Sequence, residues 1–292
     1  MSVSHPRLVA IALSAVTAMS MVPVLIKYTQ ANIETIGTAR LLISLVILSP
    51  LLLFRKGFSG LRRRDWLWLV FAGLCFGIHW WTYFYAIKVA GAATGAIAMS
   101  TFGIHLLLLN WLIHRQTLKP VDMLLVAVCA FGCYLVIPAP SLNDRTTLGF
   151  LVGVFSAMLY GAMPLIHRRM IHLSTLVRTW GQFAFAGLFF LLLWPETNWQ
   201  LAAPDWWSLL VLGTVCTLFA HGLWVKASSE LPGLLTGSIH YLYPPMTMVQ
   251  SWLFLNERIT GGMIAGALMI ISANLVLIAS PWWRLQRRRA GS

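Results

Sequence analysis

Charged residues are scarce in this chain, and their scarcity decides its class. Asp, Glu, Lys and Arg make up only 10% of the 292 residues, against about 25% in a typical soluble domain. Hydrophobic residues make up 59%, and the mean hydropathy is +0.77. So few charges cannot cover the surface of a water-soluble globule of this size. The composition therefore indicates an integral membrane protein and excludes a disordered or collagen-like chain.

Acidic residues are the rarest charged residues, with 8 Asp and Glu against 21 Lys and Arg. All of them lie at or near the ends of the apolar segments, whereas proton- and cation-driven carriers often place a carboxylate deep in the bundle. Paired carboxylates, a serine-centred elbow and metal-ligand spacing are missing as well. The four cysteines lie inside apolar runs, which favours buried small side chains over disulfides. We therefore expect no enzyme, no cofactor and no bound metal.

The surplus of basic residues gives a net charge of +13. A basic chain can bind nucleic acid, but membrane proteins also collect Lys and Arg in cytoplasmic loops, and we expect no nucleic-acid partner. Counted over alternate loops, fifteen basic residues lie on one side, four lie on the other, and two lie within apolar runs. This bias predicts that both termini lie in the cytoplasm, and the location we expect is a bacterial inner membrane, as the resemblance given below implies.

Long apolar runs are abundant. A spanning helix needs about 20 mostly apolar residues. The first run resembles a signal peptide, but its apolar stretch continues too far, which favours a retained helix. The sequence predicts an all-α membrane fold with ten transmembrane helices. The ten runs cover residues 8–27, 33–54, 66–87, 92–113, 119–138, 147–166, 175–194, 207–227, 233–255 and 260–280.

The two halves of the chain are similar at an offset near 142 residues, which indicates an internal repeat. The matching positions are Ser14-Ala15 with Ser156-Ala157, His79 with His221, and Thr94-Gly95 with Thr236-Gly237. Each half would hold five spans, and an odd number turns the second copy upside down in the membrane. Such an inverted repeat lets a site near the midplane open to either side in turn.

This repeat predicts three parts of the chain. Residues 1–140 form the first five-helix repeat, residues 141–284 form the second, and residues 285–292 form a basic cytoplasmic tail.

The segment from Leu253 to Leu277, LFLNERITGGMIAGALMIISANLVL, resembles the closing part of an EamA-type repeat in the drug/metabolite transporter superfamily. In that pattern a proline-containing helix ends in Glu and a glycine-rich helix follows. The matching residues here are Pro244, Pro245, Glu257, Gly262 and Gly266. The first repeat departs from the pattern, with Gln116 in place of the Glu and Gly103 in place of the Pro. The resemblance implies a ten-helix carrier of small metabolites, and aromatic-rich members of this kind are similar to bacterial aromatic amino-acid exporters.

Polar and aromatic side chains within the runs are candidates for a substrate site, because a polar group in hydrocarbon must face the bundle or a cavity. At 100° per residue, His79, Thr82 and Tyr83 share one helix face. The alternative for each aromatic residue is the interfacial belt, and for each His it is a bond to a neighbouring helix. The predicted substrate-binding residues are His79, Trp81, Thr82, Tyr83, Ser100, Thr101, Tyr160, Trp180, His221, Trp224, Tyr241 and Tyr243.

Arg40 is a costly residue to place about 10 Å into the second run, at 1.5 Å per residue. Its guanidinium could hold a substrate carboxylate in a fork. Snorkelling to the membrane surface, or capping the carbonyls of another helix, is the favoured alternative. Arg178 is predicted to be an anchor at a span end, and His105 and His240 are predicted to be packing residues.

The resemblance and these residues together imply an exporter of small amphiphilic metabolites that works by alternating access, with amino acids, including aromatic ones, as the favoured cargo. The expected partners are a small-molecule substrate and the lipid bilayer, and the oligomeric state is not predicted. One alternative is a carrier of the same fold for another metabolite or drug. The others are a polytopic membrane enzyme and a channel.

Overall fold

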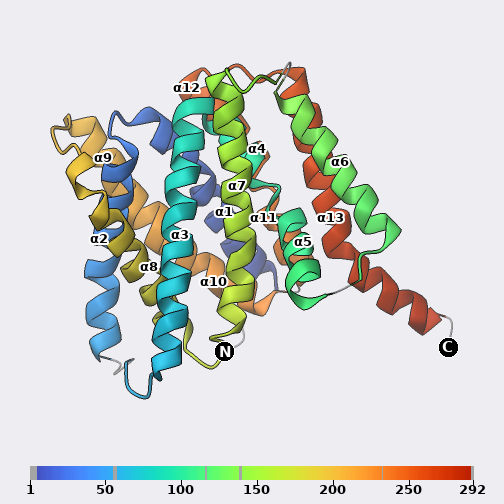
Figure 1. Ribbon diagram of the computed structural model, residues 1–292, viewed down its shortest axis with the longest axis horizontal. Helices are drawn as coiled ribbons and strands as arrows, with labels where there is room; N and C mark the ends of the chain where they lie inside the picture. Colours follow the sequence, from blue (N-terminus) through green and yellow to red (C-terminus); the bar gives the residue numbers. More distant parts are fainter. Residues whose placement is uncertain (1–4, 55–57, 116, 138–139, 232, 291–292) are drawn as a thin grey trace.

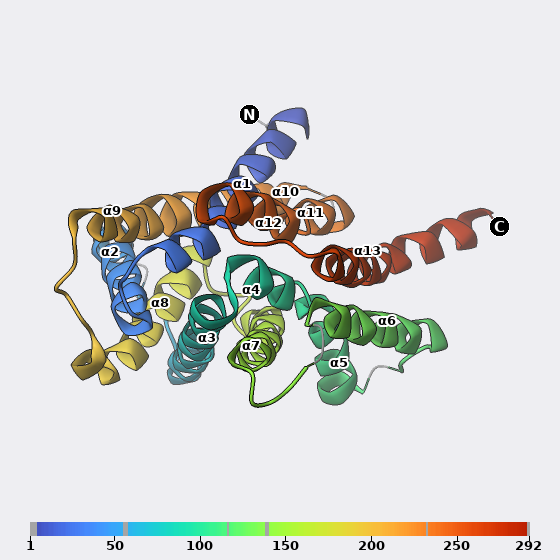
Figure 2. The same ribbon diagram turned by 90° about the horizontal axis from the view of Figure 1, so that it is seen from above.

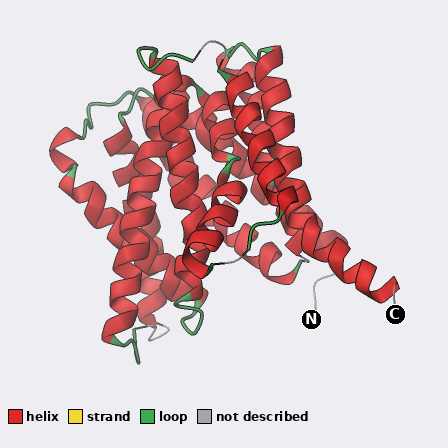
Figure 3. Ribbon diagram, turned by 45° about the vertical axis from the view of Figure 1, so that its right-hand side comes forward, coloured by secondary structure: helices red, strands yellow, loops and turns green. Residues whose placement is uncertain are grey.

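The computed structural model describes residues 5–54, 58–115, 117–137, 140–231 and 233–290, and every regular element in these ranges is helical (Figures 1 and 3). The all-α class is therefore confirmed. The elements are α1 (His5–Tyr28), α2 (Ile33–Phe54), α3 (Arg63–Ala90), α4 (Ala92–Met99), α5 (Phe102–His114), α6 (Pro120–Val136), α7 (Arg145–Arg168), α8 (Thr175–Leu192), η1 (Trp194–Glu196), α9 (Ala203–Val211), the π-helical η2 (Leu212–Phe219), α10 (Ala220–Glu230), α11 (Gly233–His240), α12 (Tyr243–Leu255) and α13 (Gly261–Ala290).

Each of the ten apolar runs is mostly helical where the structure describes it. Within the described ranges, eight helical segments are long and apolar enough to cross a membrane, and α6 is a shorter apolar helix. One of the eight combines α4 and α5, and another combines α9 and η2 with the start of α10. The run predicted at 233–255 is divided into α11 and α12 by a turn. The chain is therefore a multi-pass membrane protein in which two of the runs contain a break.

Helices of the two halves are interleaved (Figure 2). Helix α3 packs along α7, and its repeat counterpart α10 packs along α1. Helix α2 packs on α8, and α6 packs on α13, so these two pairs join equivalent helices of the two halves (Figures 1 and 2). The core is therefore built between the halves rather than within each one.

The repeat also recurs in the local backbone. Asn32 and Ser174, which differ by 142 positions, each cap the helix that follows, with the side-chain oxygen accepting from a backbone N–H three residues on. Arg115 and Asn256, which differ by 141 positions, end α5 and α12 with φ values of 50° and 54°. A left-handed residue at this place is a common helix stop.

Two of the runs are broken at equivalent places. Helix α4 ends where the hydroxyl groups of Ser100 and Thr101 donate to the carbonyls of Ile97 and Ala98, at 2.6 and 2.8 Å. Such side-chain bonds compete with the helical backbone ladder. The second break precedes α12, whose first turn contains proline, where the missing N–H costs least. By contrast, the prolines of α1 and α7 lie inside unbroken helices.

Glycines allow the closest helix contacts. A Cβ on Gly73 of α3 would lie 2.3 Å from the Cβ of Phe185 and 2.9 Å from the backbone nitrogen of Ala186 on α8. A Cβ on Gly266 of α13 would lie 2.4 Å from the carbonyl oxygen of Gly132 on α6. Small residues at such crossings let helices approach closely in a membrane, as the glycine-rich segment predicts.

Glu257 of the second half caps a helix of the first half. Its Oε1 accepts from the backbone nitrogen of Ala92 at 2.7 Å, and its Oε2 accepts from that of Ala93 at 3.0 Å. A carboxylate at this position neutralises the positive end of the α4 dipole. Gly91, with φ +101°, provides the sharp reversal before α4 and lies against the same carboxylate.

Two further carboxylates join the halves at opposite ends of the molecule. Asp65, at the start of α3, contacts Nε2 of His172 at 2.9 Å. Asp205, 140 positions later at the start of α9, accepts from the Thr29 hydroxyl and the Gln30 backbone nitrogen, both at 2.8 Å. At one end Asp65 of the first half holds a loop of the second half, and at the other end Asp205 of the second half holds a loop of the first half.

Candidate functional site

A central cavity of about 80 Å³ lies between the halves, and both helix breaks contribute to its wall. Its lining comes from α1 to α5 and α7, and from α11 and α12, so both halves of the chain take part. The lining residues are Met19, Val22, Arg40, Phe76, His79, Trp80, Tyr83, Phe84, Met99, Ser100, Phe102, Tyr160, His240, Tyr243 and Pro244.

Arg40 supplies the cation of this cavity. Its side chain is 2% exposed, so the predicted snorkelling to the surface is wrong. Nε and Nη2 both donate to the Thr217 hydroxyl, at 3.1 and 3.0 Å, and the guanidinium carbon lies 4.2 Å from the ring centroid of Trp80. Among the described residues no carboxylate lies within ion-pair distance of Arg40, and its Nη1 has no hydrogen-bond partner.

The π-helical register of η2 places the acceptor for Arg40. The Thr217 hydroxyl donates to the carbonyl of Leu212, five residues earlier, at 2.6 Å. That bond uses its only proton, and its lone pairs are left for the guanidinium. The orientation of Arg40 is thus fixed by a neutral group, and its positive charge has no counter-ion among the described residues.

His79 ties α3 to α7 at the cavity wall. The Ser156 hydroxyl donates to the His79 carbonyl at 2.7 Å, so the same hydroxyl accepts from Nδ1–H of the ring, which lies 2.8 Å away. A neutral His79 therefore carries its proton on Nδ1, and Nε2 is an acceptor. The ring is stacked with Tyr83 and tilted against Tyr160, with centroids 5.9 and 5.2 Å apart.

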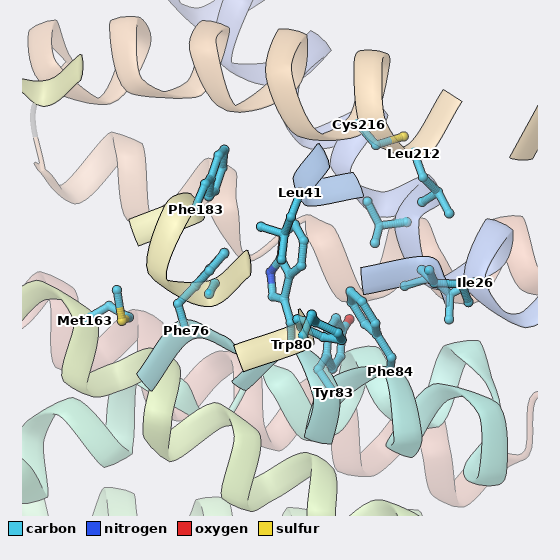
Figure 4. Packing of buried hydrophobic residues seen from close by; sticks show 14 of the residues in the cluster. Ile26, Leu41, Phe76, Trp80, Tyr83, Phe84, Met163, Phe183, Leu212 and Cys216 are labelled. Carbon is cyan, nitrogen blue, oxygen red and sulfur yellow. The ribbon is translucent and has the colours of Figure 1, made fainter. Parts of the chain in front are cut away.

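Aromatic residues of α3 form one side of the cavity. Phe76, Trp80, Tyr83 and Phe84 recur at helical spacing and lie close together in the buried cluster (Figure 4). The Tyr83 hydroxyl lies 2.5 Å from that of Tyr243, so a polar contact joins α3 to α12 across the two halves. The wall therefore combines apolar rings with hydroxyl groups, as a site for an amphiphilic molecule requires.

The structure brings together about half of the residues that the sequence nominated. The nominated residues that line the cavity are Arg40, His79, Tyr83, Ser100, Tyr160 and Tyr243. The side chain of His221 lies outside the described residues, so its predicted approach to the same space stays a prediction.

Six other nominated residues lie outside the cavity lining. Trp81 donates to Glu34 at 2.9 Å, and Trp180 donates to Ser49 at 2.9 Å, so each indole N–H is used elsewhere. The hydroxyl groups of Thr82 and Thr101 donate to backbone carbonyls of their own helical turns.

The last two of the six lie behind cavity residues. Tyr241 stacks on Phe102 with ring centroids 5.4 Å apart. Trp224 packs against His240 with ring centroids 5.1 Å apart. Their rings support the lining from outside rather than forming it.

Sequence reasoning missed several lining residues. Phe76, Trp80 and Phe84 follow an i, i+4, i+8 pattern that includes Tyr83 on the same face, so helical periodicity could have found them. His240 was assigned to packing but lies in the wall. Among the described residues no group of His, Cys, Asp and Glu is placed to hold a metal.

Comparison with known proteins agrees with the fold and the repeat. A model of the EamA-like transporter family matches residues 7–137 and again residues 147–279. A crystal structure described only as that of a protein is similar over 99% of this chain and 100% of its own, with a TM-score of 0.65 and 17% identity, a likeness of fold alone. No curated protein matches the chain. Because the two matches cover most of its length, the chain belongs to the EamA-like transporter family.

Proposed function

We propose that this membrane transporter exports small amphiphilic metabolites that carry a carboxylate, with amino acids, including aromatic ones, as its cargo. The observation that carries the proposal is Arg40, a buried cation in the cavity wall without a counter-ion among the described residues. An unpaired buried charge costs several kcal/mol, and a bound carboxylate would offset that cost with charge-assisted hydrogen bonds.

The rest of the lining suits the other groups of an amino acid. Phe76, Trp80 and Phe102 would hold an apolar or aromatic side chain, and the flexible Met19 and Met99 can adapt to its size. Ring faces and hydroxyl oxygens would receive the ammonium group.

The size of the cavity is consistent with this cargo. A water molecule needs about 10–15 Å³ of such space, so 80 Å³ holds roughly five to eight waters, or about 150–240 Å³ of liquid. That is comparable to the bulk of one amino acid.

A different cargo on the same fold remains the second candidate. A sugar phosphate would require several cations, and Arg40 is the one Lys or Arg among the described lining residues. An uncharged nucleobase would leave the guanidinium unpaired.

The transport cycle we propose is alternating access by two inverted five-helix repeats, ten spans in all. The exchange of helix contacts between halves, the paired helix breaks and the 141-residue spacing of Arg115 and Asn256 support it. The excess of Lys and Arg in alternate loops supports cytoplasmic termini, and we propose a bacterial inner membrane as the location.

Flux through reconstituted protein tests the proposal. Proteoliposomes loaded with labelled Phe, Met or Thr should release label at a saturable, protein-dependent rate, and empty liposomes should not. Phenethylamine, a nucleobase and a sugar phosphate form the comparison panel. The cargo assignment is wrong if no amino acid moves while a member of this panel does.

A further inference from the structure

A second cavity lies close to the central one, on the side of the basic loops. It has a volume of about 470 Å³ and lies between the end of α7, the first turns of α8, and η2. Polar side chains are grouped in its wall. They are His167, Thr175, Arg178, Thr179, Gln182 and Thr217.

Two buried polar atoms of the residues in this wall, one donor and one acceptor, have no hydrogen-bond partner among the described residues. Nε2 of His167 lies 2.8 Å from Oε1 of Gln182, which makes Nε2 the donor and Nδ1 the acceptor of a neutral ring. That Nδ1 is buried without a partner among the described residues. Nη2 of Arg178 donates to the Thr175 hydroxyl at 3.2 Å. The Nε of Arg178 is buried and has no partner in the described part of the chain.

No Asp or Glu is among the described residues of this wall, so Arg178 has no counter-ion there, although it is partly exposed and Arg40 is buried. A guanidinium with an unused donor suits a carboxylate. An imidazole nitrogen that can only accept suits an ammonium N–H. Because both residues line one cavity, they suit the backbone end of a free amino acid.

A wall one side chain thick separates this cavity from the central one. Thr217 lines the second cavity and accepts both hydrogen bonds from Arg40, which lines the first. Phe183 lines the second cavity and packs against Phe76 and Trp80 of the first, with ring centroids 5.8 and 6.1 Å apart.

We propose that the second cavity is a separate binding site at which the cytoplasmic cargo first docks, its carboxylate on Arg178 and its ammonium group near His167, before it passes Phe183 and Thr217 to reach Arg40. This inference rests on the proposed function. It assigns to Arg178 a cargo contact in place of the anchoring role that the sequence predicted.

Cysteine protection tests the site directly. In Thr179→Cys, a membrane-impermeant thiol reagent applied from the basic-loop side labels a position in the cavity wall. Phe or Met at concentrations that saturate flux should slow this labelling about tenfold or more. Adding Arg178→Gln should abolish the protection. Adding Arg64→Gln, which removes an exposed charge on the same side, should leave it intact.

Two controls identify where the cargo binds. Ile171→Cys, 75% exposed on the neighbouring loop, should be labelled at the same rate with and without cargo. Protection of Thr179→Cys should persist when Arg40→Met weakens the central site, because the two sites are distinct.

The outcomes separate this inference from the proposed function. Flux of amino acids without protection of Thr179→Cys, or protection that survives Arg178→Gln, overturns the second site alone. Absence of amino-acid flux in the unsubstituted protein overturns both.

Discussion

Replacing Arg40 with Met gives the sharpest test of the cargo assignment, because it removes the charge and keeps much of the apolar volume. The substitution should weaken binding of an amino acid but hardly change binding of the corresponding carboxamide. The negative carboxylate is attracted to the guanidinium more strongly than the neutral oxygen of a carboxamide is.

The magnitude follows from the surroundings of Arg40. The side chain is 2% exposed, so neither solvent nor salt screens it strongly. A hydrogen bond to a charged group contributes about 1.5–3 kcal/mol, which corresponds to roughly 10- to 150-fold in Kd. Removing an unpaired buried charge is often neutral or stabilising, so the variant should unfold at no lower temperature than the unsubstituted protein.

The assay is equilibrium binding of Phe and phenylalaninamide to protein in lipid nanodiscs. The unsubstituted protein should prefer the acid to the amide by the factor above, and Arg40→Met should lose that preference. The control Arg64→Met removes an exposed charge that does not line the cavity, and it should keep the preference for the acid. If Arg40→Met still distinguishes acid from amide, the carboxylate does not bind at Arg40 and the reasoning fails.

Three further substitutions test the fold around the site by thermal unfolding in detergent. Gly73→Ala should destabilise the protein by about 1–3 kcal/mol, because its Cβ would meet the α8 backbone, whereas Gly187→Ala makes only a 3.5 Å contact and should be tolerated. Glu257→Gln should lower stability by about 1–2 kcal/mol through loss of the charged cap of α4, and the exposed Glu196→Gln should have no effect. Tyr83→Phe should cost about 1 kcal/mol, since it removes the hydroxyl contact across the cavity, and an unchanged melting temperature would contradict that contact.

Much of the fold could be predicted from the sequence because hydropathy alone locates apolar helices. The run at 66–87 corresponds to Arg63–Ala90, and the run at 119–138 corresponds to Pro120–Val136. The π-helical register around Thr217 could not be predicted, because hydropathy carries no information on which carbonyl each backbone N–H or hydroxyl meets.

The site was predictable only in part, because composition does not give the rotation of a helix about its axis. Trp80 and Trp81 are neighbours in sequence and 100° apart on α3. Packing of α3 against α7 and α8 turns Trp80 to the cavity and Trp81 to Glu34. In the same way, nothing near Arg40 in sequence indicates Thr217, which is 177 positions away.

The cap formed by Glu257 limits which amino-acid substitutions the two halves can accept during evolution. Its donors are main-chain amides, which every residue except proline supplies, so positions 92 and 93 carry no side-chain record of the contact. Position 257 must keep a carboxylate, whereas for this contact positions 92 and 93 can carry any residue except proline. A loss at Glu257 therefore has no ready compensating substitution on the opposite side, and the contact at the start of α4 depends on a single carboxylate.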